Sequence, residues 1–203
     1  MSYLPAQSIQ QRAAGVGLVM IVDASCGFCA ECASGVRLNC TVPDALGGLC
    51  GPAVPSAAAA GLTRALLTAA ALATIAPEAD STPIAAIGRN AEAVATFARR
   101  AAGTEVISAP DSRDPALRRR LADAHVTTRP RIALSASSLR SAVRLARRGG
   151  FAAAPGDVSD LPSVTEVVQR EVTLAQAHSV RDLLQTLSPE DWADAAAAVL
   201  AQQ

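Results

Sequence analysis

The sequence contains no lysine, and all 18 of its basic residues are arginine. This absence excludes a Schiff-base lysine and the lysine of a phosphate-binding P-loop. Aromatic side chains are also few, with three Phe, one Tyr and one Trp. So small a number argues against a surface that stacks nucleic-acid bases.

Charge of either sign is not in excess, because 18 acidic residues balance the 18 arginines. A net charge of zero gives no electrostatic footprint for nucleic acid or an anionic membrane. Residues 1–12 lack the charged start and apolar core of a signal peptide. The most apolar stretch, 57–76, is rich in Ala and contains Arg64, which favours a buried helix over a membrane span. We therefore expect a cytoplasmic protein that binds neither nucleic acid nor membrane.

Short apolar runs alternate with helical segments of roughly ten residues from residue 83 onward, a pattern typical of βαβ units. Continuous apolar runs fit strands that are covered on both faces. The sequence thus predicts an α/β fold with a Rossmann-like parallel sheet of five or six strands. The expected strands are 83–88, 105–109, 131–135, 151–154 and 171–175, and the expected helices are 57–76, 91–102, 115–124, 139–148, 179–187 and 189–201. A further strand is expected at 17–23, and the prolines of 51–56 predict a turn or linker.

Four of the five cysteines fall within fifteen residues, in the spacing Cys-x2-Cys-x2-Cys-x7-Cys. This spacing predicts one structural zinc ion held by Cys26, Cys29, Cys32 and Cys40, because zinc takes four thiolates in a tetrahedron. Four protein ligands close the site to water and substrate, so the zinc is not expected to be catalytic. Cys50 lies outside the spacing.

Three other interpretations of the cluster remain open. An iron–sulfur ligand run has a shorter last gap followed by Pro, whereas here the gap is seven and Thr41 follows. A thiol-disulfide site at Cys26 and Cys29 would leave Cys32 and Cys40 unexplained. Four unbound thiols at this density would be unusual. Zinc remains the favoured interpretation.

The segment CGFCAECASGVRLNC resembles the structural zinc lobe of the medium-chain alcohol dehydrogenases. Weaker similarities follow in the same order: GLVMIVDAS (17–25) resembles the strand before the lobe, RIALSAS (131–137) and RRGGFA (147–152) resemble parts of the nucleotide-binding domain, and EVTLAQAHSVRDLLQTL (171–187) resembles its last strand and helix. The resemblance implies a remnant of a GroES-like domain with the zinc lobe at 1–56 and a Rossmann-like domain at 57–203. It also implies truncation at both ends and a homodimer formed through the sheet.

The catalytic part of that family is not matched. Nothing before Gly17 resembles its catalytic Cys or its Gly-His-Glu segment, and His125 and His178 fall where the family has no metal ligand. We interpret both histidines as surface or packing residues. The resemblance therefore implies that the catalytic zinc site is absent.

The dinucleotide-binding loop is also altered. Of the family's Gly-x-Gly-x-x-Gly pattern only Gly88 survives, while Asn90 and Ala93 replace the other glycines. Glu92 places a negative charge in the first helical turn, where it would compete with a phosphate. Pro110 stands where the family has its ribose-binding acid, and Asp111 beside it is the candidate substitute. The cofactor-binding candidates are thus Gly88, Asn90 and Asp111, and the changes around them argue against NAD(P) binding.

These features predict a dehydrogenase-like zinc protein that has lost independent dehydrogenase activity and has a non-redox or accessory role, for example in a biosynthetic pathway. The alternatives are a working NAD(P)-dependent oxidoreductase and a thiol-disulfide oxidoreductase that uses Cys26 and Cys29. Expected partners are a second copy or another subunit, with room for a small-molecule ligand. The arginine-rich stretch 113–131 is interpreted as a solvated helix face, with an anion or partner site as the sharper hypothesis.

Overall fold

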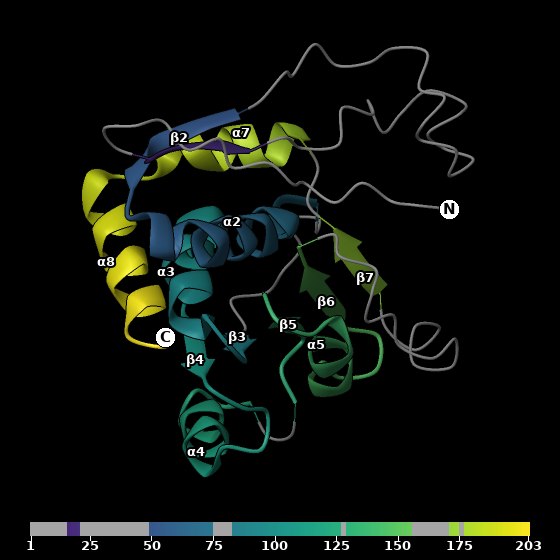
Figure 1. Cartoon of the computed structure of the whole chain (residues 1–203). Coiled ribbons are helices and arrows are strands. Elements are labelled where there is room, and N and C mark those ends of the chain that lie inside the picture. The colour runs from purple at the N-terminus through teal and green to yellow at the C-terminus, as the bar shows by residue number, and fades with distance from the viewer. Residues whose placement is uncertain (1–15, 21–48, 75–82, 127–128, 156–170, 175–176) are drawn as a thin grey trace, which may run out of the picture.

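A parallel sheet of five strands forms the centre of the computed structural model (Figure 1). The structure describes residues 16–20, 49–74, 83–126, 129–155, 171–174 and 177–203. The strands lie in the order β4-β3-β5-β6-β7, and every neighbouring pair is parallel. Their bounds are β3 Ile84–Ile87, β4 Val106–Ala109, β5 Ile132–Leu134, β6 Phe151–Ala154 and β7 Glu171–Leu174. The predicted Rossmann-like α/β class is confirmed, whereas the predicted zinc lobe lies outside the described residues.

Two layers of helices cover the sheet, which explains why its strands are continuous apolar runs. All four residues of β3 are buried. Ala85 and Ile87 face the layer formed by α4 (Pro115–Asp123) and α5 (Leu139–Leu145), while Ile84 and Ala86 face the other layer. That second layer consists of α2 (Ser56–Ala70), the 3-10 turn η2 (Ala71–Thr74), α3 (Ala91–Ala102), α7 (Ala177–Thr186) and α8 (Pro189–Leu200). No described helix is long and apolar enough to cross a membrane.

Small residues let α2 approach its neighbours closely. A Cβ at Gly61 would lie 2.6 Å from Val199 Cγ1 of α8 and 3.0 Å from Asn90 Nδ2 at the start of α3. An aromatic pair joins the other two helices of this contact: Phe97 and Trp192 meet edge to face, with ring centroids 5.1 Å apart. Such pairs add roughly 0.5–1.5 kcal/mol beyond the area they bury. The three helices therefore form one tightly packed unit on the sheet.

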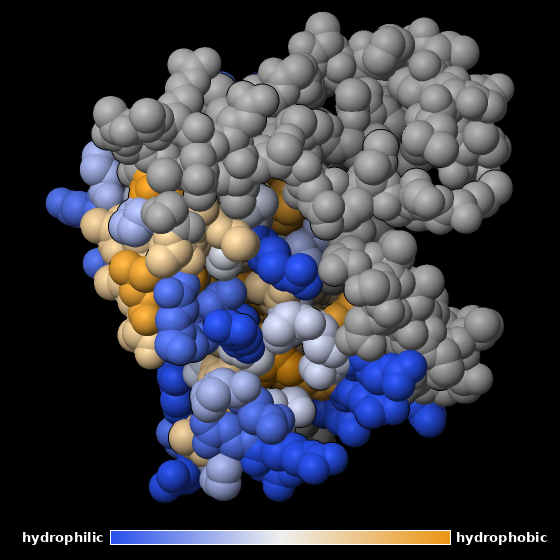
Figure 2. Space-filling view, in the orientation of Figure 1, coloured by the Kyte–Doolittle hydropathy of each residue, from blue (hydrophilic) through white to orange (hydrophobic). Residues whose placement is uncertain are grey.

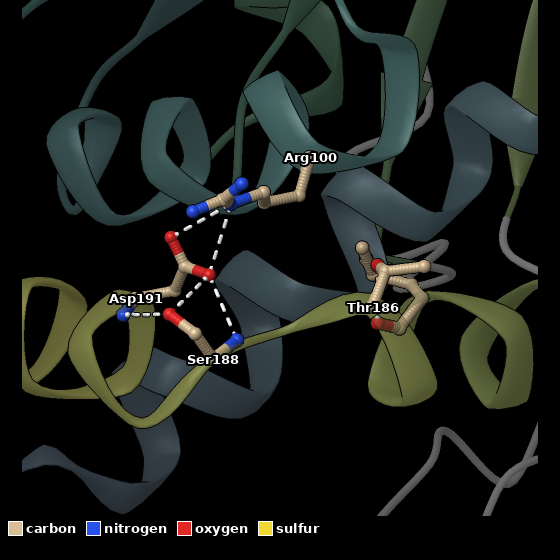
Figure 3. A network of polar contacts seen from close by, with 5 residues as sticks. Arg100, Thr186, Ser188 and Asp191 are labelled. Atoms are coloured by element: carbon tan, nitrogen blue, oxygen red, sulfur yellow. Dashed lines mark hydrogen bonds and ion pairs between the residues drawn. The ribbon is translucent and has the colours of Figure 1, made fainter.

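Polar contacts fix α8 on α3 at the start of α8 (Figure 3). The side chain of Ser188 accepts from the Asp191 N–H at 3.2 Å, and Asp191 accepts from the Ser188 N–H at 2.8 Å, which forms a capping box. The Nε of Arg100 on α3 lies 3.0 Å from both carboxylate oxygens of Asp191. The buried carboxylate of Asp191 thus completes the capping box of α8 and joins α8 to α3.

The segment predicted as a linker at 51–56 is instead largely a strand. Residues Leu49–Val54 form β2, which pairs antiparallel with β1 (Val16–Met20). The register shifts between Gly17 and Val19, opposite Gly51 and Pro52. A bulge tolerates proline because it requires no N–H from that residue, and Pro55 then ends the strand. The domain boundary expected after residue 56 stays a prediction.

Arginine side chains close the outer edge of β4. The N–H groups of Ile84 and Gly88 donate to the carbonyls of Glu105 and Ala109, so the alternate carbonyls of β4 face away from β3. Arg99 Nη2 donates to the outward Val106 carbonyl at 3.2 Å, and Arg120 Nη1 donates to that of Ser108 at 3.0 Å. These carbonyls are therefore hydrogen-bonded although no described strand pairs with this edge.

Candidate functional site

The chain changes direction between β3 and β5. After β4 it crosses back over β3 to form β5 on the other side, so the loops that follow β3 and β5 diverge at their carboxyl ends. Ligands of open α/β sheets bind in the crevice at such a switch point. We call the two loops here, 88–90 and 135–138, the switch-point site. It is the candidate site that the topology indicates.

The loop after β3 has an unusual backbone. Gly88 has φ of 88° and Asn90 has φ of 65°, both in the left-handed region. Gly88 also lacks room for a side chain, because a Cβ there would collide with Ser137 Oγ. Asn is one of the few residues other than Gly that enter this region readily. Asn90 therefore keeps the shape of a glycine-rich turn while filling the space that glycine would leave.

The loop after β5 is held by its serines. Ser135 is fully buried, and its Oγ accepts from the N–H groups of Ser138 at 3.1 Å and Ser137 at 3.4 Å. Ser138 then caps α5 by accepting from Ser141 N–H at 3.2 Å. From α2, Arg64 Nε donates to the Ala136 carbonyl at 2.8 Å. This loop is thus satisfied by its own groups and by one arginine from the opposite helix layer.

The two residues that end the chain contact the amino ends of α3 and α2. The Asn90 N–H donates to Gln202 Oε1 at 2.6 Å, and Gln203 Nε2 donates to the Ala57 carbonyl at 2.6 Å. Asn90 itself is buried. N–H groups at the amino end of a helix are the groups that bind a pyrophosphate in dinucleotide-binding loops. Here a carboxamide oxygen of the same chain occupies one of them.

Glu92 lies in the first turn of α3 and makes two contacts. Its carboxylate accepts from the Ser108 hydroxyl of β4 and pairs with Arg99 at 3.6 Å. A carboxylate stabilises the amino end of a helix through the helix dipole, which is also the interaction that a phosphate would use. Glu92 therefore supplies the negative charge that this helix end favours.

Asp111 follows β4, as the sequence predicts for a ribose-binding acid, but its own turn uses the carboxylate. Its Oδ1 accepts from the Arg113 N–H at 2.9 Å and from the Ser112 hydroxyl at 3.2 Å. The bond from the Arg113 N–H, with help from the Ser112 hydroxyl and the Arg113 charge, holds the pKa of Asp111 below its ordinary value. The acid is thus charged and exposed, but it functions as a turn acceptor.

The predicted metal ligands cannot be placed in this way. Cys26, Cys29, Cys32 and Cys40 all lie outside the described residues. His125 is exposed in the turn after α4, at φ of 60°, and His178 belongs to α7. Within the described ranges, no three His, Cys, Asp or Glu side chains gather as a metal site.

The structure brings Gly88 and Asn90 together, and it adds residues that sequence reasoning did not select. The sequence gives a weak indication of Ser135 and Ser137, since a serine-rich loop directly follows a predicted strand. Arg64 is also indicated, as the lone charge in an Ala-rich helix. The sequence gives no indication of Gln202, because it is 112 residues from Asn90 along the chain.

Comparison with known proteins gives only structural likenesses, because no family model and no curated protein matches the chain. The solved structures include ECK1772 of Escherichia coli, an oxidoreductase/dehydrogenase of unknown specificity (14% identity, 87% of this chain, 65% of that one, TM-score 0.47). L-idonate 5-dehydrogenase of Escherichia coli is similar at 14% identity over 87% of this chain and 66% of that one, with a TM-score of 0.44. CAD of Helicobacter pylori, solved with NADP(H), is similar at 14% identity over 86% of this chain and 65% of that one, with a TM-score of 0.42.

The chain resembles these proteins in fold. The match covers most of this chain, yet the chain spans less than two thirds of the length of these three proteins. At such identities and TM-scores the likeness says nothing about activity, substrate or cofactor. The Rossmann-like fold follows from the strand order and the helix layers described above.

Proposed function

We propose that this chain is a dehydrogenase-like protein that does not act as an independent NAD(P)-dependent dehydrogenase and has a non-redox or accessory role. The observation that supports this most directly is the 2.6 Å hydrogen bond from the Asn90 N–H to Gln202 Oε1. It takes up a donor at the helix end where a dinucleotide would place its pyrophosphate.

Three further features in or near the switch-point site support the same conclusion. Glu92 adds a negative charge to the first turn of α3, which repels a second anion. Ser137 lies directly against Gly88, where a dinucleotide loop approaches its ligand. The Asp111 carboxylate accepts from the Arg113 N–H of its own turn instead of from a ribose hydroxyl. A dinucleotide would be repelled by Glu92 and would have to displace the contacts of the other groups.

The remaining expectations belong to this proposal. Cys26, Cys29, Cys32 and Cys40 would hold a closed structural zinc, which shapes its loop and does not react. The protein would be cytoplasmic and would act as a homodimer or as a subunit beside another protein. A small-molecule ligand other than a dinucleotide remains compatible with the serine-rich loop after β5.

The test is a titration of the purified, zinc-loaded chain with NADH and NADPH, followed by calorimetry and by cofactor fluorescence, with zinc measured on the same sample. The proposal expects no binding up to millimolar cofactor. A Gln202→Ala variant releases the Asn90 N–H, and Gln203→Ala is its matched control because it leaves that contact in place. Micromolar binding by the unmodified chain would refute the proposal and restore the oxidoreductase alternative.

A further inference from the structure

The arginines of this electrically neutral chain are concentrated on one side of the fold. Residues 113–155 contain ten arginines and two aspartates, a net charge of +8, whereas the rest of the chain carries eight arginines and 16 acids. From residue 124 to 155 there are six arginines and no acid. This segment builds α4, β5, α5 and β6, so its helices form one layer of the sheet. In Figure 2 strongly hydrophilic residues gather over the positions that α4 and α5 occupy in Figure 1.

Five of these arginines lie on the segments around the amino ends of β5 and β6. Arg129 Nη1 donates to the Arg144 carbonyl at 2.9 Å, and the Arg147 N–H donates to the carbonyl of Pro130, next to Arg129. Phe151 N–H donates to the Arg131 carbonyl at 2.8 Å. We call Arg129, Arg131, Arg144, Arg147 and Arg148 the arginine corner. It lies at the amino ends of the strands, opposite the switch-point site.

The backbone of the arginine corner is held in one shape. A Cβ at Gly150 would collide with the Arg131 carbonyl and lie 2.9 Å from that of Arg147. Gly149 beside it has φ of 69°. The turn between α5 and β6 therefore needs both glycines, and it presents Arg147 and Arg148 with exposed side chains.

Grouped like charges repel within the screening length of about 8 Å at physiological salt. Part of the corner stabilises the fold, because cations favour the carboxyl end of a helix and Arg129 lies at that end of α5. Arg131 lies over the ring of Phe151, 5.7 Å from its centroid. The exposed pair Arg147 and Arg148 is not needed for either contact, so its charge is available for association.

We propose that the arginine corner binds an acidic, carboxylate-rich surface of a partner protein. The planar guanidinium group pairs with carboxylates through two parallel hydrogen bonds. Complementary charge at a surface guides association and selects the partner. Because the whole chain is neutral, its positive potential is confined to this region. A compact acidic patch on a partner matches a region of that kind.

A nucleic acid fits these observations less well. Among the described residues, the one aromatic side chain at the corner is Phe151, which is half-buried beneath Arg131 and cannot stack on a base. A long polyanion would also meet the surplus of acids carried by the rest of the chain. The acidic protein surface is therefore the occupant that the charge distribution favours. This inference does not depend on whether the switch-point site binds a dinucleotide.

The test uses the full-length chain and a fluorescein-labelled deca-glutamate peptide, with anisotropy measured at low and at physiological ionic strength. We expect binding that weakens as salt rises. The double variant Arg147→Ser/Arg148→Ser should weaken it roughly fivefold, since each exposed pair contributes a few tenths to one kcal/mol. The control is Arg118→Ser/Arg181→Ser, which removes the same charge from exposed positions outside the arginine corner and should weaken binding clearly less. Thermal unfolding of both variants checks that the fold is retained.

Four outcomes would overturn the proposal. The first is no binding at low salt. The second is an equal loss in both double variants, because binding would then follow net charge alone. The third is tighter binding of a single-stranded oligonucleotide with the same number of negative charges. The fourth is salt-dependent self-association that Arg147→Ser/Arg148→Ser abolishes, because the acidic surface would then belong to a second copy.

Discussion

Replacement of Asp191 by Ala should destabilise the protein more than any comparable change on α8. The carboxylate accepts from the Ser188 N–H at 2.8 Å, from the Ser188 hydroxyl at 2.9 Å and from Arg100 Nε at 3.0 Å. Its side chain is only 12% exposed, whereas that of Arg100 is 52% exposed. Ser188 remains as the N-cap, but the other half of the capping box, the bond from the Ser188 N–H, is lost at a cost of about 1 kcal/mol. Loss of the bonds from the Ser188 hydroxyl and Arg100 adds about 1–2 kcal/mol.

The expected total of about 2–3 kcal/mol is a large part of the 5–15 kcal/mol that holds a typical domain together. Arg100→Ala removes only the ion pair. Because that guanidinium is half-exposed, its loss should cost about 0–1 kcal/mol. Asp194→Ala, at an exposed position of the same helix, corrects for the better helix propensity of Ala.

The assay is urea unfolding of the three variants beside the unmodified chain, followed by far-ultraviolet circular dichroism. We expect Asp191→Ala to lower the free energy of unfolding at least twice as much as Arg100→Ala, and Asp194→Ala to be close to neutral. Equal costs for Asp191→Ala and Arg100→Ala would refute it, because the ion pair rather than the helix cap would then dominate.

The same carboxylate predicts a pH dependence. Burial by itself raises the pKa of Asp191, but hydrogen bonds from the Ser188 N–H, the Arg100 guanidinium and the Ser188 hydroxyl outweigh it and hold the pKa below the ordinary value of 3.8. A carboxyl with a depressed pKa stabilises the fold fully above its unfolded value and loses that contribution as the pH falls through the folded value. The difference between the unmodified chain and Asp191→Ala should therefore be constant near neutral pH and shrink below about pH 4.

Three further substitutions test other features. Gly88→Ala should lower the melting temperature more than Gly103→Ala, because both positions have positive φ but only the first also lacks space for a Cβ. Gly61→Ala should destabilise the fold in urea despite a helix-propensity gain of about 1 kcal/mol, since Val199 Cγ1 would lie 2.6 Å from the new Cβ; a net gain would show that α8 can move aside. Cys40→Ser should reduce zinc below one ion per chain in elemental analysis, and an unchanged zinc content would rule out the predicted four-cysteine site.

Local sequence patterns predicted the sheet well because its central strands, β3 and β5, are short apolar runs whose residues are all buried. Ile84–Ile87 illustrates this, since every one of its four positions is buried. The capping box of Ser188 and Asp191 likewise joins residues three positions apart. Such features depend on neighbours in sequence, so the sequence contains the information needed to predict them.

Contacts between distant segments could not be predicted from local sequence patterns. The hydrogen bond that joins Gln202 to Asn90 depends on how α8 packs on α3, and neither residue alone indicates it. The segment at 51–56 was misjudged because its prolines predict a turn wherever the pairing partner is unknown. A net charge of zero likewise contains no information about where the arginines lie in space.

The satisfied outer edge of β4 has a consequence for how this protein behaves when concentrated. A foreign strand that approached this side would find the Val106 and Ser108 carbonyls already bound by Arg99 and Arg120. It would have to displace two guanidinium groups and place its own backbone beside their charge. Lateral growth of the sheet into fibres or swapped assemblies is thereby discouraged on this flank.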